Sequence, residues 1–398
     1  MHEWRVPFFL IWRHLKRGSI WTLLLIIFLM AIAFINLVFV TCLFNGIIAS
    51  SNTKIIQTFS GNITIYPAKG DDYIEHADKE LEKIRRVDGV EAASAHYTVP
   101  TTYKWKNIKL TYRLYGIDPT DEKRVTTINE SMTYGRYLDP SDTDSIIIGA
   151  QVAGDEESAY RSFKGIKVGD TITAILPNNI EKKLKLKGIF YANFIESDYQ
   201  TFITKKTADT LLPSFKNAAS SILIKTDGSA SETTIINRLK ARGVKGEMHT
   251  WQDSAGIMKS VTKSFTSIDV LLSLVGTLIA AVTIFIVIYI DINNKRQQIG
   301  ILRAIGVKPY LIWTVYVLQS AVYATAGVTL GTIMFFSILV PYFNAYPFRL
   351  PIGDATLIVD YSVFILRAEL VMWVAVFSGL IPAVHVTRMN MLDEIRGK

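Results

Sequence analysis

The stretch Asp291–Trp313, DINNKRQQIGILRAIGVKPYLIW, decides the fold because it places a short basic segment between two long apolar ones. Residues 270–290, just before it, hold no charged side chain, and another apolar run begins near Tyr310. A hydrocarbon core about 30 Å thick is crossed by about 20 residues of helix. We therefore predict that this stretch connects two transmembrane helices.

Two further apolar runs complete the pattern. Residues 21–48 hold no Asp, Glu, Lys, Arg or His over 28 positions, whereas a secretory signal has only about 7–15 apolar residues, so we interpret this run as an uncleaved anchor. The fourth run, 370–386, follows Arg367 and Glu369 and contains Pro382. The predicted fold class is an α-helical membrane protein with four transmembrane helices, one plus three, and a large α+β extracytoplasmic domain between the first two.

The basic side chains predict the orientation. Short loops rich in Lys and Arg are typical of the cytoplasmic side, and they flank the first run, fill the connector and follow the fourth run. Both termini are therefore predicted to lie in the cytoplasm, with the chain in the cell inner (plasma) membrane. The predicted order is a cytoplasmic segment (1–19), helix one (20–48), the extracytoplasmic domain with stalk extensions (49–267), helix two (268–290), a cytoplasmic loop (291–309), helix three (310–343), a short outer loop (344–369), helix four (370–386) and a cytoplasmic tail (387–398).

The predicted outer domain shows no pattern for catalysis. Alternating apolar residues in GNITIYP, KLTYRLYGI, TITAIL and KLKLKGIF predict strands. His76, His96 and His249 lack metal-ligand spacing, and GxxxxGK[ST] occurs nowhere in the chain. Cys42 is the only cysteine and lies outside the predicted outer domain, so disulfides cannot stabilise that domain. We expect no catalytic residue, no metal, no cofactor on this chain and no enzyme activity; the positive charge lies largely at the membrane flanks and calls for no nucleic acid.

A helical apolar face precedes the second membrane run. After Trp251, the residues Ile257, Val261, Phe265 and Ile268 follow at steps of four, four and three. A helix over 254–290 would be about 55 Å long at 1.5 Å per residue. Two interpretations stay open: a rigid stalk that carries a displacement to the outer domain, or a helix that only anchors it.

The connector itself has the pattern of a short helix. Ile299, Leu302 and Ile305 form an apolar stripe, Gly306 suits the position after the helix end, and Pro309 closes the element. Such a helix lies along the membrane or docks in a groove of a soluble partner.

The sequence NKRQQIGILRAIGVKP resembles the connector between the second and third membrane helices in permeases of the MacB/FtsX/Lol superfamily of ABC transporters (mechanotransmission, type VII). FNGI with GNITIYP, YGIDPTDEKRV, KVGDTITAIL, TWQDSAGIMKSV and IPAVHVTRMNMLDEIRGK resemble further parts of these permeases, in the same order. The resemblance implies a dimer of permease subunits, homo- or heterodimeric, and a separate dimeric ABC ATPase that binds Mg-ATP. It places the ATPase-coupling helix at Lys295, Arg296, Gln297, Gln298, Ile299, Gly300, Ile301, Leu302, Arg303, Ala304, Ile305 and Gly306, and the stalk at Trp251, Ile257, Val261, Phe265 and Ile268.

The resemblance also implies a mechanism and a choice of substrates. ATPase motion would move the stalks, and the outer domains would act on a lipoprotein or another lipidic substrate, as in unfused LolC/LolE-type permeases, with a periplasmic chaperone or adaptor as a further partner. The segment ILPNNIEKKLKLKGIF is short where the chaperone-recruiting Lol subunit carries a hook. The alternatives are MacB-like efflux of amphipathic drugs, peptides or haem-like molecules, and FtsX-like regulation of a cell-wall hydrolase, whose outer domains are smaller.

Overall fold

The computed structural model describes residues 20–154, 162–213, 216–254, 256–348, 350 and 353–387, without the side chains of 22 and 254–262. Within these ranges, four helices are long and apolar enough to cross a membrane: Leu23–Ser60, Lys263–Asn294, Pro309–Ala345 and Tyr361–His385. The four predicted apolar helices are therefore confirmed, and with them a multi-pass membrane protein. The predicted cytoplasmic segment 1–19 and nearly all of the tail lie outside the described residues.

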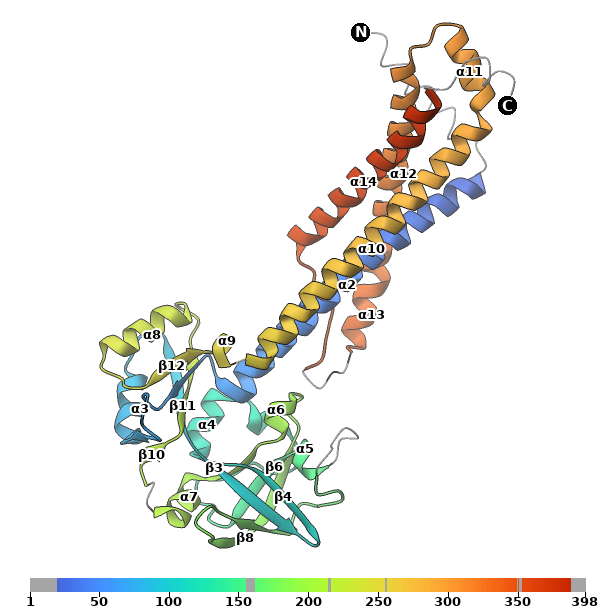
Figure 1. The fold of residues 1–398 in the computed structure, drawn as a ribbon. Coiled ribbons are helices and arrows are strands. Elements are labelled where there is room, and N and C mark those ends of the chain that lie inside the picture. Colours follow the sequence, from blue (N-terminus) through green and yellow to red (C-terminus); the bar gives the residue numbers. More distant parts are fainter. Residues whose placement is uncertain are drawn as a thin grey trace. The chain divides into compact units, whose positions relative to one another are not determined.

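The chain divides into two compact units. We call the first the membrane unit (residues 1–46, 262–348 and 355–398) and the second the sheet unit (47–261 and 349–354). Helices of the membrane unit, some of which continue into the sheet unit, are α2 (Ile20–Ile55, followed by the π-helical turn η1, Ile56–Ser60), α10 (Gly256–Asn294), α11 (Arg296–Ala304), α12 (Pro309–Met334, followed by η4, Phe335–Leu339), α13 (Val340–Ala345) and α14 (Tyr361–Thr387) (Figure 1).

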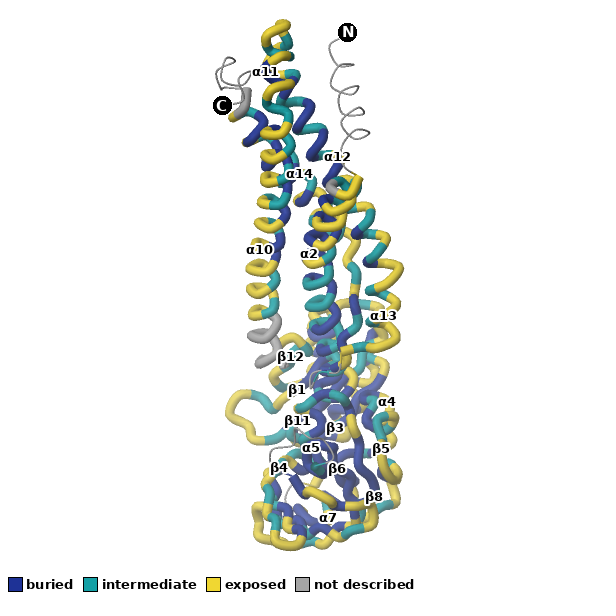
Figure 2. Tube along the Cα trace, turned by 90° about the vertical axis from the view of Figure 1, so that its right-hand side faces the viewer, coloured by how far each residue is buried: buried dark blue, intermediate teal, exposed yellow. Residues whose placement is uncertain are grey.

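Apolar side chains both fill and coat the membrane unit. Met30, Phe34, Ile284, Ile288 and Tyr316 belong to its buried core. One side of α10 stays exposed along much of its length (Figure 2). Exposed leucines and isoleucines on a helix whose backbone groups are satisfied internally suit contact with lipid.

Glycines bring α12 against α2. A Cβ atom added at Gly327 would lie 2.5 Å from Cβ of Met30, and one added at Gly331 would lie 2.9 Å from Cδ1 of Phe34. Small residues at this four-residue spacing let membrane helices approach closely. The close packing predicts a clear cost for any side chain at Gly327.

Helix α14 begins at Tyr361, nine residues before the predicted start at 370. Its first turn is capped by Asp360, whose Oδ1 accepts hydrogen bonds from the backbone N–H of Ser362 at 2.9 Å and of Val363 at 3.4 Å. Arg367 lies inside the helix because its charge is paired with Asp269. The predicted outer loop 344–369 is therefore too long: the segment between α13 and α14 covers only 346–360.

The strands of the sheet unit alternate with short helices. The strands are β1 (Ile63–Tyr66), β2 (Ile74–Glu75), β3 (Val90–Trp105), β4 (Ile108–Ile117), β5 (Met132–Gly135), β6 (Ser145–Gly149), β7 (Thr171–Ile175), β8 (Glu181–Phe190), β9 (Thr201–Thr204), β10 (Ala218–Ala219), β11 (Ser221–Thr226) and β12 (Glu247–Thr250). The helices are α3 (Ala77–Arg85), α4 (Pro119–Val125), η2 (Ile128–Glu130), α5 (Ala150–Ala153), α6 (Ile195–Asp198), α7 (Lys205–Leu211), α8 (Glu232–Ala241) and α9 (Trp251–Ser254).

The long strand β3 belongs to two halves of this unit. Its first part, up to His96, pairs with β11, and its second part, from Tyr97, pairs with β4. Because β7 pairs with both β3 and β8, the described strands β3, β4, β9, β6, β8 and β7 close into a barrel. One apolar core fills this barrel, and another lies where α3 and α8 cover β1 and β11 (Figure 1).

Candidate functional site

The connector forms the helix α11, and its end has the geometry that the sequence predicts. Gly306 has φ of +93°, its N–H donates to Arg303 O at 3.0 Å, and Val307 N–H donates to Leu302 O at 3.1 Å. These two bonds make a Schellman motif, which a glycine after the helix end favours. Pro309 then opens α12.

The apolar residues of α11 do not lie on one face. Ile299 is buried, with 3% of its surface exposed, and packs into the core of the membrane unit, whereas Ile305 is 73% exposed. With 3.6 residues per turn, six positions rotate the side chain by about 240°. The expected single stripe of Ile299, Leu302 and Ile305 is therefore wrong, because it combines an inward and an outward residue.

An exposed face on α11 emerges instead. Ile301 is 50% exposed and lies one turn from Ile305. We call these residues and the exposed side chains beside them the coupling face, which consists of Gln297, Gln298, Ile301, Ala304 and Ile305. Of the other predicted coupling residues, Gly300 is buried, Gly306 is exposed, and Lys295, Arg296, Leu302 and Arg303 are half-buried.

A polar network that the sequence did not reveal joins α10, α11 and α12. The carboxylate of Asp291 accepts a hydrogen bond from Lys295 Nζ, at 2.7 Å to Oδ1, and another from Gln319 Nε2, at 3.2 Å to Oδ2. Gln319 Nε2 also donates to Tyr323 Oη at 2.7 Å. Because Lys295 is the residue before the first turn of α11, the network ties the start of this helix to both neighbouring spans.

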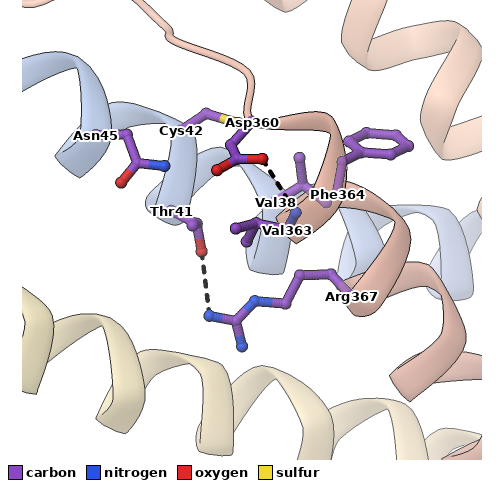
Figure 3. Close-up of a pocket in the computed structure, with 8 residues that line it drawn as sticks. All are labelled: Val38, Thr41, Cys42, Asn45, Asp360, Val363, Phe364 and Arg367. Carbon is purple, nitrogen blue, oxygen red and sulfur yellow. Dashed lines mark hydrogen bonds between the residues drawn. The ribbon is translucent and has the colours of Figure 1, made fainter.

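A second polar cluster joins α2, α10 and α14. Arg367 Nη2 lies 2.9 Å from Asp269 Oδ2, and the hydroxyl of Thr41 donates to Asp269 Oδ1 at 2.7 Å. Figure 3 shows Arg367 reaching from α14 toward Thr41, beside a pocket that Cys42 and Asp360 also line. Each charge of the pair lies in a separate helix 98 residues from the other, so spacing along the sequence gave no signal for it.

The predicted stalk residues are placed only in part. Trp251 begins α9 and is half-buried, Phe265 stacks on Phe44 with ring centroids 5.0 Å apart, and Ile268 is exposed. The side chains of Ile257 and Val261 lie outside the described residues. The helix α10 itself starts at Gly256, close to the expected start at 254.

The sheet unit holds a buried pair of titratable side chains, His96 and Glu122, at the point where β3 passes from β11 to β4. His96 Nε2 lies 2.6 Å from Glu122 Oε2, and the two side chains are 4% and 1% exposed. Ser94 Oγ donates to the same carboxylate at 2.7 Å, and Thr126 Oγ1 donates to its Oε1 at 2.9 Å. Burial raises the pKa of Glu122, but the charge and hydrogen bond of His96, helped by both hydroxyls, outweigh burial and lower the pKa.

The hydrogen bonds of this cluster connect α4 to β3, which indicates a structural role. Ser94 donates to the carboxylate and not to the imidazole, so no activated hydroxyl nucleophile results. Among the described residues, no three His, Cys, Asp or Glu side chains are grouped to hold a metal ion.

A known protein family matches most of the C-terminal part of the chain, which belongs largely to the membrane unit. Residues 270–391 match the family model described as "FtsX-like permease C-terminal". The matched region begins within α10 and includes α11, α12, α13 and α14, so these elements are similar to the C-terminal part of FtsX-like permeases.

Two curated relatives extend the similarity. The chain is 28% identical over 131 residues to the ABC transporter permease YtrF of Bacillus subtilis, covering 31% of this chain and 30% of YtrF. It is 21% identical over 372 residues to the macrolide export ATP-binding/permease protein MacB of Campylobacter jejuni, covering 87% of this chain and 55% of that protein. The chain is thus a homologue of the MacB and YtrF ABC transporter permeases, and it spans between about a third and about half of their length.

Two solved structures resemble about half of the chain. The extracellular domain of the ABC-type transporter YknZ from Gram-positive bacteria aligns at 14% identity with a TM-score of 0.35, covering 47% of this chain and 97% of that one. The periplasmic region of MacB from Actinobacillus actinomycetemcomitans aligns at 12% identity with a TM-score of 0.36, covering 50% and 92%.

Proposed function

We propose that this chain is the transmembrane subunit of an ATP-driven ABC transporter and that α11 docks into a separate ATPase subunit. The observation that carries the proposal is the coupling face, which projects from a short helix between two membrane spans. In this proposal both termini and α11 lie on the cytoplasmic side of the inner membrane, and the sheet unit lies on the extracytoplasmic side.

The composition of the coupling face favours a protein groove over lipid. Ile301 and Ile305 expose apolar surface that water disfavours, whereas Gln297 and Gln298 on the same face would lose hydrogen bonds in hydrocarbon. A groove with an apolar floor and polar rim satisfies both kinds of side chain. Docking is therefore the better of the two interpretations of the connector.

The fold also offers a path for motion. In the sheet unit, Gln57 O in η1 accepts a hydrogen bond from Thr127 N–H at 2.8 Å, and the hydroxyls of Thr58 and Ser197 are 2.8 Å apart. The end of the long α2–η1 segment is thus bonded to the barrel half of the unit. We propose that ATPase motion reaches the sheet unit through α2 and α10, which then act as stalks and not only as anchors.

The proposed substrate is lipidic or amphipathic. Extraction of lipoproteins from the membrane is one candidate. The second is the export of an amphipathic small molecule, which is supported by the alignment of 87% of this chain, at 21% identity, with a macrolide exporter. The proposed partners are the ATPase dimer with its Mg-ATP, a second permease subunit, and a periplasmic chaperone or adaptor. Acylated protein that co-purifies with the complex would support the first candidate, and a bound small amphiphile would support the second.

Replacing Ile301 and Ile305 together by Asp tests the docking. Well-packed apolar residues at the centre of an interface contribute more than about 1 kcal/mol each, so association should weaken by at least about tenfold. The measurement is the amount of ATPase that co-purifies with the tagged full chain in mild detergent, together with its ATP hydrolysis.

Ile180→Asp is the matched control, because Ile180 is also an exposed isoleucine but lies in the sheet unit. It should leave the ATPase bound. If the double variant keeps the ATPase as well as the control does, α11 is not the docking element. Ile299 is unsuitable for this test, because it is buried in the core of the membrane unit and an Asp there would disturb packing.

A further inference from the structure

The outer wall of the barrel carries a cluster of positive charges. Register places Lys109 of β4 opposite Lys104 of β3, Lys104 opposite Thr173 of β7, and Thr173 opposite Lys183 of β8. Paired residues in an antiparallel sheet point to the same side, and the intervening side chains, such as Tyr103 and Leu184, fill the barrel core. The four side chains therefore form one row across the outside of four adjacent strands.

Further side chains extend this row. Arg113 and Lys185 lie on the same outer side, two or four positions along their strands, and both are exposed. Thr102, Thr111 and Thr171 add hydroxyls. We define the basic wall as Lys104, Lys109, Arg113, Lys183 and Lys185, with Glu181 as the one acidic residue on the same side of these strands.

Among the residues that the structure describes, those of the basic wall have no acidic partner, whereas several lysines elsewhere in the sheet unit do. Among those that form ion pairs are Lys182 with Asp144, Lys187 with Asp142, Lys205 with Asp78 and Lys225 with Glu91. Within the described part of the chain, none of the five basic-wall residues forms such a pair.

Lys104 and Lys109 face each other across two paired strands, and without a bound anion their repulsion destabilises the fold. Like charges directly opposite each other in a sheet destabilise the pair, and the neighbouring Thr173 supplies no negative charge. An anion bound across the row would reverse this effect, because ammonium groups and hydroxyls both donate hydrogen bonds to phosphate oxygens.

We propose that the basic wall is a binding surface for an extended polyanion that bears phosphate groups. Neighbouring strands lie about 4.8 Å apart, so the row from Lys109 to Lys183 is about 14 Å long, which suits several successive charges of a linear chain lying across the strands. This proposal does not depend on the ATPase partner. A partner recruited here would approach the barrel on the face of β4, β3, β7 and β8.

The test compares two double variants of the full-length protein in mild detergent. Lys104→Gln with Lys109→Gln removes two charges from the row, and Lys79→Gln with Lys240→Gln removes two exposed charges from α3 and α8. The probe is linear polyphosphate, titrated at several salt concentrations. Polyphosphate should bind the first variant at least about tenfold more weakly, and the slope of log K against log salt should fall by about one per lysine removed.

Thermal unfolding separates binding from folding. Because the first variant loses a repulsion, its melting temperature without polyphosphate should equal or exceed that of the wild type, and polyphosphate should raise it less. The control variant should bind like the wild type. Equal weakening in both variants would mean an effect of net charge alone and would overturn the proposal.

A membrane surface is the competing partner for such a patch. Protein in phosphatidylcholine nanodiscs is therefore also mixed with phosphatidylglycerol vesicles. Capture by the vesicles through Lys104 and Lys109, without binding of polyphosphate, would show a lipid-docking face and would overturn the assignment to a linear polyanion.

Discussion

Glu122 shows how one buried residue holds two parts of a domain together. It lies in α4, and its partners Ser94 and His96 lie at the place where β3 changes neighbours from β11 to β4. Removing one member of a buried hydrogen-bonded polar pair leaves the other without its partner. The carboxylate therefore stabilises the junction between the two halves only while it is ionised.

Acid should weaken this junction. Because the pKa of Glu122 is lower in the folded protein than its usual 4.5, its contribution is complete above the unfolded pKa and is lost as pH falls through the folded pKa. Glu122→Gln should cost about 2–3 kcal/mol at pH 7 and should flatten the loss of stability below about pH 4.5. Urea unfolding of the sheet unit, followed by circular dichroism between pH 3 and 7, measures both effects.

The exposed Glu130 gives the matched control, Glu130→Gln. This variant should keep the stability and the acid dependence of the wild type. If Glu122→Gln instead retains the full acid dependence, other carboxyl groups cause it.

Among the elements, the contact between α2 and α12 depends on the absence of a side chain at Gly327. The added methyl group of Gly327→Ala would overlap Met30 Cβ, whereas at Gly276 in α10 the nearest atoms are 3.6 Å away. Gly327→Ala should therefore destabilise the membrane unit by about 1–3 kcal/mol. Gly276→Ala should be neutral or slightly stabilising. Thermal melting of both variants in the same detergent compares them, and equal melting temperatures would contradict the close packing.

Elements determined by local patterns were predictable, and elements determined by distant partners were not. The four apolar helices, the helix of the connector and its glycine end follow from residues within a few turns. The early start of α14 does not, because Arg367 is acceptable there only through Asp269 in another helix. The closure of the barrel is equally hard to predict, because the short strand β7 must pair with β8 along its five residues and with β3 along three of them. The burial of Ile299 depends on packing against other helices, which the spacing of apolar residues in the sequence does not indicate.

At the scale of the whole molecule, docking and coupling should be separable. The coupling face is exposed, whereas Asp291 is half-buried and joins α11 to α10 and α12. If α11 is a rigid part of the membrane unit, force on the docked helix reaches the spans through Asp291 and Gln319. Asp291 is then a positioning residue that acts through α11, and it need not contact the ATPase.

Asp291→Asn should therefore leave the ATPase bound but impair its response. A charge-assisted hydrogen bond contributes about 1.5 kcal/mol, so the ATP hydrolysis that depends on the permease should fall by up to about tenfold, whereas Ile301→Asp with Ile305→Asp should remove the ATPase itself. Gln319→Leu removes the hydrogen bond between Asp291 and α12 altogether, so it should impair the response at least as much as Asp291→Asn. Lys295→Gln leaves that link in place and should have the smaller effect. Loss of the bound ATPase in Asp291→Asn would instead mean that the network only holds the docking face in shape.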